Sequence, residues 1–282
     1  MSVNQKFTII PFSSPTQEAI LEVLSKGPVD GIDLLEQVTQ KESVTKQGLY
    51  KALRQLLHQE IILKERRLFT LNKVWLSRFK DFVESSEKSL GLMLPFVDTD
   101  QKRRKVVTFK NTEALDIYWG HLFLALAEKF KDKPFFFYNH HNWSVHGRTD
   151  SDLYLYKASV RNNYQLAVTL GKNTPLARDF KKRYGKDSLQ IAIDETISVP
   201  PNDHIMTVED YLIITRYYNQ TMQKINKLFT ENTILGETEK KELQKTILAS
   251  KKQKIIIIKD AKMAQVWRRR LAKNFVVRKN DL

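Results

Sequence analysis

The sequence predicts two domains and a C-terminal extension: a small α+β domain over residues 1–72, an α/β layered domain over residues 106–235, and a basic αβα extension over residues 236–282. Three observations lead to this prediction. The chain has 282 residues, more than one hydrophobic core usually organises. Three short helical patterns and a hairpin pattern fill the segment before Lys73, whereas strands and helices alternate after Lys105. A helix and a polar stretch, residues 73–105, are expected to link the two domains.

The composition narrows the function classes. The chain contains no cysteine, which removes disulfides, thiolate catalysis and cysteine-ligated metal sites. No signal-peptide layout opens the chain, and its apolar runs are far shorter than the roughly 20 residues of a membrane helix. We therefore expect a cytoplasmic protein that does not contact a membrane.

The net charge of +15 favours a polyanionic partner, and its distribution is uneven. Residues 43–80 carry a net charge of +7, and residues 236–282 carry +9. The segment before residue 43 is acidic by comparison. The sequence therefore offers two basic regions, one in each half of the chain.

The helical patterns of the first domain cover Thr16–Lys26, Gly31–Gln40 and Ser43–Leu57. Ser43 is expected to cap the third helix, because serine readily accepts a hydrogen bond from the first helical turn. Two short β runs, Ile61–Lys64 and Leu68–Leu71, follow as a hairpin.

The third helix has two distinct faces. Its leucines fall at helical spacing and must pack inward, which turns a polar face outward. Such a face suits contacts with base edges and phosphates in a major groove, and a basic hairpin suits phosphates. The residues expected to contact double-stranded DNA are Ser43, Thr45, Lys46, Gln47, Tyr50, Lys51 and Arg54 of the helix region, with Lys64, Arg66 and Arg67 of the hairpin.

The segment QGLYKALRQLLHQEIILKERRLFTLN, residues 47–72, resembles the recognition helix and wing of winged helix-turn-helix transcriptional regulators. The resemblance covers residues 15–72. It rests on a tyrosine in the helix, an Ile-rich strand, two basic residues and a return strand. It implies an α+β winged helix that reads DNA with residues 43–57 and a basic wing at residues 61–71. One departure is Glu60, where a glycine usually follows the helix.

The linker helix, Lys73–Leu90, carries Trp75, Phe79 and Phe82 on one stripe. This stripe is too short for a coiled coil, and it could pack on the first domain or on a second copy of the chain. We expect a homodimer, because two half-sites multiply the specificity of a DNA-binding protein.

The second domain holds a cluster of polar and aromatic residues just after an aromatic strand, in the segment FFFYNHHNWSVHGRTDSD, residues 135–152. In layered α/β domains, ligands bind outside the carboxyl ends of the strands. A loop after the next strand could hold an anion with its backbone amides. The residues expected to line a ligand pocket are Asn139, His140, His141, Trp143, His146, Arg148, Asn173, Thr174 and Asp194. No metal-ligand spacing and no cofactor motif is recognised, so neither a metal nor a cofactor is expected.

Residues 111–232 weakly resemble a phospholipase-D-like effector domain, of the kind found behind winged helices in sugar-sensing archaeal regulators. The resemblance rests on the aromatic strand, the YNHHNW loop and the strand before GKNTPL. The active family uses His-x-Lys with an Asp five residues after the Lys, twice. Here the nearest approach is His146-x-Arg148, and Leu153 stands where the Asp would be. The resemblance therefore implies a sensor or dimerisation domain without catalysis.

The C-terminal extension contains Arg268, Arg269 and Arg270 in one helical turn. These side chains are either part of an ordinary surface helix or a second polyanion contact, and the sequence does not choose between the two interpretations.

Taken as a whole, the chain is predicted to be a sequence-specific DNA-binding transcription regulator and not an enzyme. Its second domain would sense a small molecule or a protein, or hold a dimer together. The alternatives are a nuclease or phosphodiesterase that uses His140, His141 or His146, and an antitoxin-like repressor that binds a protein partner. A plasmid replication initiator built of two winged helices fits less well, because strands and helices alternate after residue 105.

Overall fold

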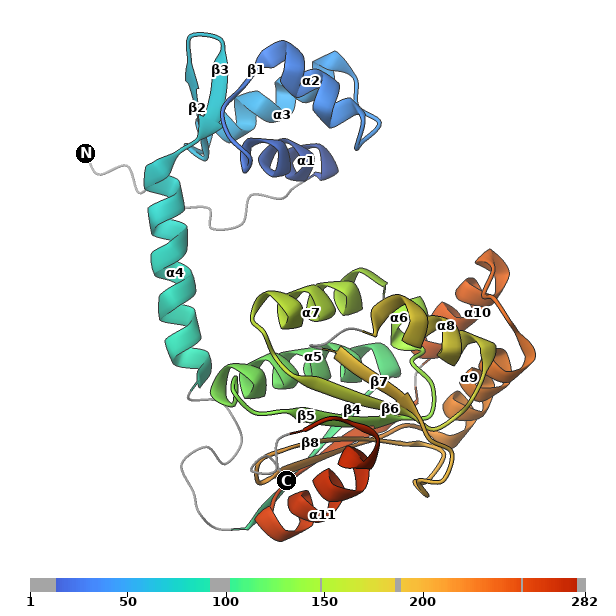
Figure 1. The fold of residues 1–282 in the computed structure, drawn as a ribbon. Coiled ribbons are helices and arrows are strands. Elements are labelled where there is room, and N and C mark those ends of the chain that lie inside the picture. Colours follow the sequence, from blue (N-terminus) through green and yellow to red (C-terminus); the bar gives the residue numbers. More distant parts are fainter. Residues whose placement is uncertain (1–13, 92–101, 148, 186–188, 250, 278–282) are drawn as a thin grey trace. The chain divides into compact units, whose positions relative to one another are not determined.

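The computed structural model describes residues 14–91, 102–147, 149–185, 189–249 and 251–277. The chain divides into two units, Met1–Leu92 and Met93–Leu282, which are shown in Figure 1. No helix among the described residues is both long and apolar enough to cross a bilayer. The molecule is mixed α and β, with a small sheet in the first unit and a large one in the second.

The first unit begins with three helices whose starts are set by local hydrogen bonds. Helix α1, Pro15–Leu24, starts after Ser14, and helix α2, Gly31–Thr39, starts after the short strand β1, Val29–Asp30. The Asp30 carboxylate accepts hydrogen bonds from the backbone N–H groups of the first turn of α2.

Helix α3, Lys46–His58, is capped by Thr45, whose Oγ1 accepts a hydrogen bond from Gly48 N at 3.1 Å. The expected cap, Ser43, was wrong: it lies before the helix. Serine and threonine are both good caps by type, so the sequence pattern alone placed the start of α3 too early.

Glu60 ends α3 in a conformation that usually belongs to glycine. Its φ is 57°, its N–H donates to Leu57 O at 3.0 Å, and the N–H of Ile61 donates to Leu56 O at 3.0 Å. This is the Schellman arrangement, in which the residue just past the helix is left-handed. The absence of glycine at residue 60 therefore leaves the turn intact and places a strained residue in it.

Two strands complete the small sheet. Strands β2, Ile62–Glu65, and β3, Leu68–Leu71, pair in antiparallel fashion, and β1 pairs with the other edge of β3, so the strand order is β1-β3-β2. The three helices and the hairpin expected from the sequence are thus present. Helix α4, Lys73–Gly91, follows the sheet directly.

The core of the first unit is formed by the apolar faces of its three short helices and its sheet. Ile20, Leu34, Leu49, Leu53 and Leu56 are among its fully buried members. Trp75, at the start of α4, packs against this core and stacks on Phe79 with ring centroids 5.6 Å apart. Packing on a shared core holds these short helices, because isolated helices of this length are marginal in water.

Glu60→Gly should stabilise the first unit by about 0.5–1 kcal/mol. A left-handed backbone costs a residue with a side chain about 1–2 kcal/mol, which glycine does not incur. Part of this gain is lost because glycine has more conformational entropy to lose on folding. Hydrogen exchange of the α3 amides measures this change. The control Glu65→Gly, within strand β2, should be destabilising. Faster exchange in Glu60→Gly than in the unsubstituted protein would contradict this expectation.

The second unit is built on one mixed sheet of order β4-β10-β9-β8-β5-β6-β7. Neighbouring strands are antiparallel from β4 to β5, and β5, β6 and β7 are parallel. The strands are β4 Arg103–Phe109, β5 Phe135–Asn139, β6 Leu166–Leu170, β7 Leu189–Ile193, β8 Asp203–Val208, β9 Tyr211–Arg216 and β10 Gln253–Lys259.

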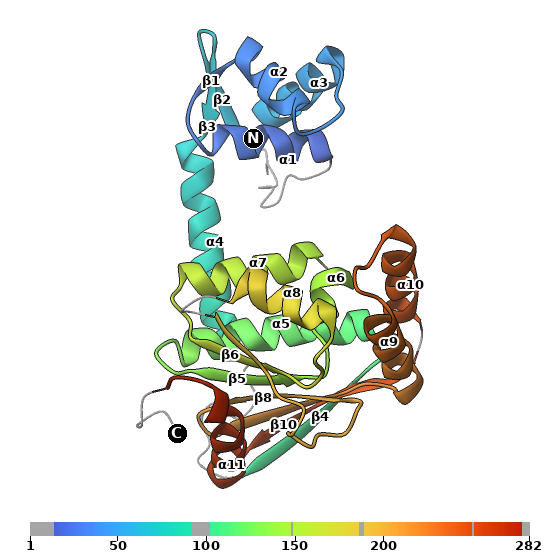
Figure 2. The same ribbon diagram turned by 45° about the vertical axis from the view of Figure 1, so that its right-hand side comes forward.

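Helices cover both faces of this sheet, as Figures 1 and 2 show. One face packs against residues of α5, α8, α9 and α10, and the other packs against α11 and the chain that follows it. The helices are α5 Thr112–Lys129, α6 Ser144–Gly147, α7 Thr149–Arg161, α8 Pro175–Tyr184, α9 Asn219–Glu231, α10 Glu237–Leu248 and α11 Ala261–Leu271. A 3₁₀ turn, Ala272–Asn274, follows α11.

The structure corrects two expectations about domain layout. Residues 236–282 do not form an extension, because β10 lies between β4 and β9 inside the sheet and buries Ile255, Ile256 and Ile257. The second unit also begins before residue 106, since β4 starts at Arg103 and pairs with β10 along its whole length. A strand from the far end of the chain is therefore needed to complete the fold.

Candidate functional site

The first candidate site is the outward face of α3. Leu49, Leu53 and Leu56 are buried in the core of the first unit, so the opposite side of the helix faces solvent. All the residues expected there are exposed, namely Ser43, Thr45, Lys46, Gln47, Tyr50, Lys51 and Arg54. Thr45 also holds the start of the helix with its side chain, so its hydroxyl is already engaged.

The basic side chains of this face form no ion pair with any acidic residue that the structure describes. Lys46, Lys51 and Arg54 take part in no ion pair among the described residues, whereas Lys41 nearby in sequence pairs with Glu22. An unpaired, exposed cation remains available to a phosphate or a base edge. The outward face of α3 is thus a positively charged surface.

The hairpin between β2 and β3 adds three exposed cations. Lys64 Nζ lies 5.3 Å from the centre of the Phe69 ring, and Arg66 and Arg67 form the two-residue turn, with Arg66 at a φ of 55°. The pKa of Asp30 is lowered by the backbone N–H groups of Asp33 and Ile32, and to a smaller extent by Arg67. The arginine turn therefore exerts its charge on the start of α2, within the same unit as α3.

Sequence reasoning missed exposed apolar residues in this unit. Ile32, in the first turn of α2, is 79% exposed, and Leu63 and Leu68 of the hairpin are 47% and 46% exposed. The two leucines follow from the alternation of a strand, since Ile62 and Phe69 next to them point into the core. Strand alternation does not predict the exposure of Ile32, because this residue lies in a helix.

The second candidate site is a cavity of about 70 Å³ in the second unit, where β5 and β9 end and β8 begins. Three expected pocket residues line it, namely Asn139, His141 and Trp143. His204, Thr215 and Tyr217 line it as well and were missed. They are distant from β5 in sequence. They reach the cavity because β8 pairs in antiparallel fashion with β5 and β9 pairs in antiparallel fashion with β8, which brings the start of β8 and the end of β9 to the end of β5.

Two buried histidines give this cavity its chemistry. His141 and His204 are 2% and 7% exposed, and neither His141 Nδ1 nor His204 Nε2 has a hydrogen-bond partner among the described residues. Burial lowers the pKa of His141 to about 4, and it lowers the pKa of His204 well below its usual range. Both rings are therefore neutral near pH 7, and each has a ring nitrogen that can donate or accept a further hydrogen bond.

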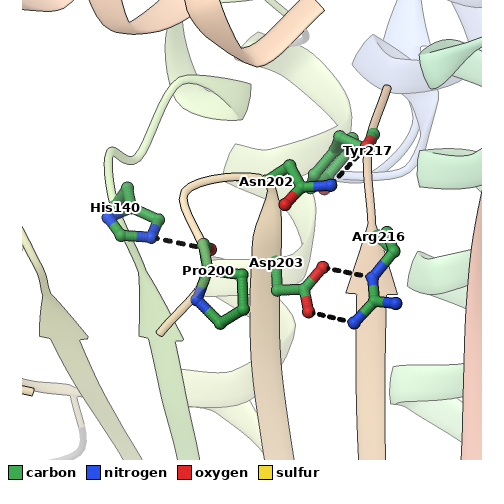
Figure 3. A network of polar contacts seen from close by, with 6 residues as sticks. All are labelled: His140, Pro200, Asn202, Asp203, Arg216 and Tyr217. Atoms are coloured by element: carbon green, nitrogen blue, oxygen red, sulfur yellow. Dashed lines mark hydrogen bonds and ion pairs between the residues drawn. The ribbon is translucent and has the colours of Figure 1, made fainter. Parts of the chain in front are cut away.

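The remaining expected pocket residues do not share this cavity. The His140 ring turns the other way, with Nε2 3.1 Å from Pro200 O (Figure 3). His146 and Thr174 line a smaller adjoining hollow, where the His146 ring packs on Phe229.

The expectation of one pocket is therefore wrong for several residues. Asn173 is exposed and accepts a hydrogen bond from Arg178, and Asp194 accepts hydrogen bonds from Thr196 and Asn274. Arg148 lies outside the described residues. The loop that follows β5 is also interrupted by the short helix α6, which places His146 at the adjoining hollow.

The three arginines of α11 face different surroundings. Arg269 is exposed, Arg270 lies over the Trp267 ring at 5.1 Å, and Arg268 is half-buried with Nε and Nη1 enclosed and without a partner among the described residues. Successive helix residues point about 100° apart, so three in a row cannot form one surface. A shared polyanion contact by all three stays a prediction without support from this geometry.

The described residues contain no group of three or more His, Cys, Asp or Glu side chains arranged to hold a metal. Of the pair expected to approach a phospholipase-D-like motif, His146 and Arg148, only His146 is among the described residues. Burial lowers the pKa of His146, and this ring packs against an aromatic side chain.

Comparison with known proteins finds one weak structural similarity. No family model and no curated protein matches the chain. One solved structure, of the archaeal chromatin protein TrmBL2, described as showing a novel mode of DNA binding, aligns over 90% of this chain and 89% of that chain, with 12% sequence identity and a TM-score of 0.31. A likeness of this size leaves function to be argued from the residues themselves.

The lowered pKa of His141 predicts a pH effect with a definite sign. As the pH falls below 6.5, the unfolded chain takes up a proton on this residue before the folded protein does, so the free energy of unfolding falls and levels off below about pH 4. Imidazole NMR signals of the folded protein should show the His141 ring neutral at pH 5. A ring that titrates near pH 6.5 would show that the cavity is open to water.

Proposed function

We propose that the protein is a winged-helix, sequence-specific DNA-binding transcription regulator. One observation carries the proposal. Helix α3 has a fully buried leucine face, and the cations on its opposite face form no ion pair among the described residues. The arginine-tipped hairpin lies in the same unit. Opposite charges three or four residues apart would stabilise a helix that had only a structural role, and α3 contains no acidic residue to form such a pair.

The proposed roles of α3 and of the hairpin follow from the chemistry of their side chains. Gln47, Lys51 and Arg54 lie on the outward face of α3, where Gln suits adenine and Lys or Arg suits guanine edges in the major groove. The Arg66-Arg67 turn suits phosphates, which position a protein on the duplex without reading sequence. The proposal is therefore base contact by α3 and backbone contact by the hairpin.

Lys51→Ala/Arg54→Ala should weaken binding to a specific duplex by about 2–5 kcal/mol, at least roughly thirty-fold in Kd, because each lost base contact is worth about 1–3 kcal/mol. Fluorescence anisotropy with the DNA upstream of the protein's own gene, and with a random duplex, measures the change. The loss should be larger on the upstream DNA.

The matched control for this experiment is Lys26→Ala/Lys80→Ala, which removes two exposed charges of the same unit that lie outside α3 and the hairpin, just after α1 and within α4. It should lower affinity only slightly and equally on both duplexes. Equal binding by the α3 variant and the unsubstituted protein would refute the recognition helix.

For the second unit we propose a sensor role, in which the cavity between β5, β8 and β9 takes a small effector. Two neutral imidazoles with unused nitrogens suit hydrogen bonding to a ligand. They suit catalysis less well, because a general acid or base works best with a pKa near the working pH. The cavity therefore favours a binding role over the alternative of a nuclease or phosphodiesterase.

We also propose that the protein acts as a homodimer through α4. Phe79 and Phe82 follow Trp75 by one and two helical turns, so the three share a stripe, and Phe82 is 42% exposed. A second copy of the same helix could cover this stripe and place two α3 helices on two half-sites.

Phe82→Glu should therefore shift the protein toward monomer, because it places a charge in the shared apolar stripe. Sedimentation equilibrium over a range of concentrations measures the association constant. The control Val74→Glu alters an exposed apolar residue on another side of the helix and should not change it. A dimer of unchanged strength in Phe82→Glu would exclude α4 as the interface.

A further inference from the structure

A groove of about 380 Å³ lies in the second unit where α9 begins and β10 starts, and it is separate from the cavity described above. The groove is lined by Arg216, Lys252, Gln253 and Lys254, together with Tyr218 and Asn219 at the start of α9. The proposed functions make no use of this groove. Its lining residues are polar or basic, and the Asp203 carboxylate comes from the strand position opposite Arg216.

That carboxylate is already engaged. Asp203 forms a two-pronged contact with Arg216, with Nε to Oδ1 at 2.7 Å and Nη2 to Oδ2 at 2.5 Å (Figure 3). Lys254 stands directly opposite Arg216 on the neighbouring strand. Neither Lys252 nor Lys254 has an ion pair among the described residues, so the groove keeps an uncompensated positive charge.

Helix α9 points its positive end at the same groove. It begins after Tyr218, and no side chain caps its first turn. A helix start leaves backbone N–H groups without intrahelical acceptors, and the helix dipole adds partial positive charge there. The groove thus combines side-chain cations with backbone donors.

A buried amide supplies an independent observation. Gln253 is 1% exposed, and its Oε1 accepts a hydrogen bond from Tyr218 N at 2.6 Å. A backbone N–H can only donate, so this bond fixes the orientation of the amide. The other end, Nε2, is then a donor, and it has no acceptor among the described residues. Buried donors are nearly always satisfied in proteins, so the site lacks an acceptor that a ligand would provide.

We propose that this groove binds a phosphate group. Lysine ammonium groups, free helix N–H groups and an unsatisfied amide donor all call for an anion with several acceptor oxygens, which a phosphate supplies. The phosphate belongs either to a DNA backbone or to a small phosphorylated compound. A DNA phosphate would make the groove a second backbone contact of the proposed regulator, whereas a small compound would make it an effector site.

The first arm of the test uses inorganic phosphate with the full-length protein in isothermal titration calorimetry at low ionic strength. Lys252→Gln/Lys254→Gln should lower phosphate affinity at least ten-fold. The matched control, Lys181→Gln/Lys182→Gln, removes two exposed charges from α8 and should bind as the unsubstituted protein does. Thermal unfolding followed by circular dichroism verifies that both variants are folded.

The second arm measures the salt dependence of duplex binding with the same three proteins. Each lost phosphate contact lowers the slope of log K against log salt concentration by about one. A lower slope in the groove variant identifies the DNA backbone as the source of the phosphate. An unchanged slope with lost affinity for inorganic phosphate identifies a small phosphorylated ligand.

The proposal is overturned if the groove variant matches the unsubstituted protein in both arms. Lys51→Ala/Arg54→Ala run in parallel separates this outcome from failure of the proposed DNA recognition. That variant should keep its affinity for inorganic phosphate even where it loses the specific duplex, because its substitutions lie in the first unit.

Discussion

The burial of one face of α3 is the constraint on which the proposed function depends. Leu49, Leu53 and Leu56 have almost no exposed surface, and they hold α3 against the other two short helices of its unit. Once these leucines are fixed, the helical period leaves no freedom in where the polar face of α3 points. The same core anchors the hairpin through Ile62 and Phe69, so the two basic elements are rigidly related within one unit.

In the second unit the corresponding constraint is the insertion of β10 between β4 and β9. This strand buries isoleucines on both faces and separates β4 from β9, so the end of the chain completes a core that begins at β4. Its first residue, Gln253, stands at the groove beside the start of α9. The strand that completes the core therefore also positions the groove, which places both proposed ligand sites of this unit at ends of strands.

The parts of this structure that sequence could predict are those set by local periodicity and local charge. The faces of α3 follow from the spacing of its leucines, and the hairpin follows from two short apolar runs around two arginines. The start of α3 could not be predicted, because Ser43 and Thr45 are both good caps. His204 was missed because it sits inside an apolar strand pattern, and only the pairing of β8 with β5 brings it to His141. The inner position of β10 could not be predicted from its own residues either, because it depends on pairing with β4 and β9, which are distant in sequence.

The central claim is that α3 and the hairpin are the surface that meets DNA, and NMR of the isotope-labelled full-length protein with its upstream duplex tests it most directly. If α3 and the hairpin meet DNA, the backbone amide signals of Gln47, Lys51, Arg54 and Arg66 should shift on titration, and the signal of the buried Leu53 should shift much less. Shifts confined to the second unit, with the signals of α3 and the hairpin unmoved, would contradict it.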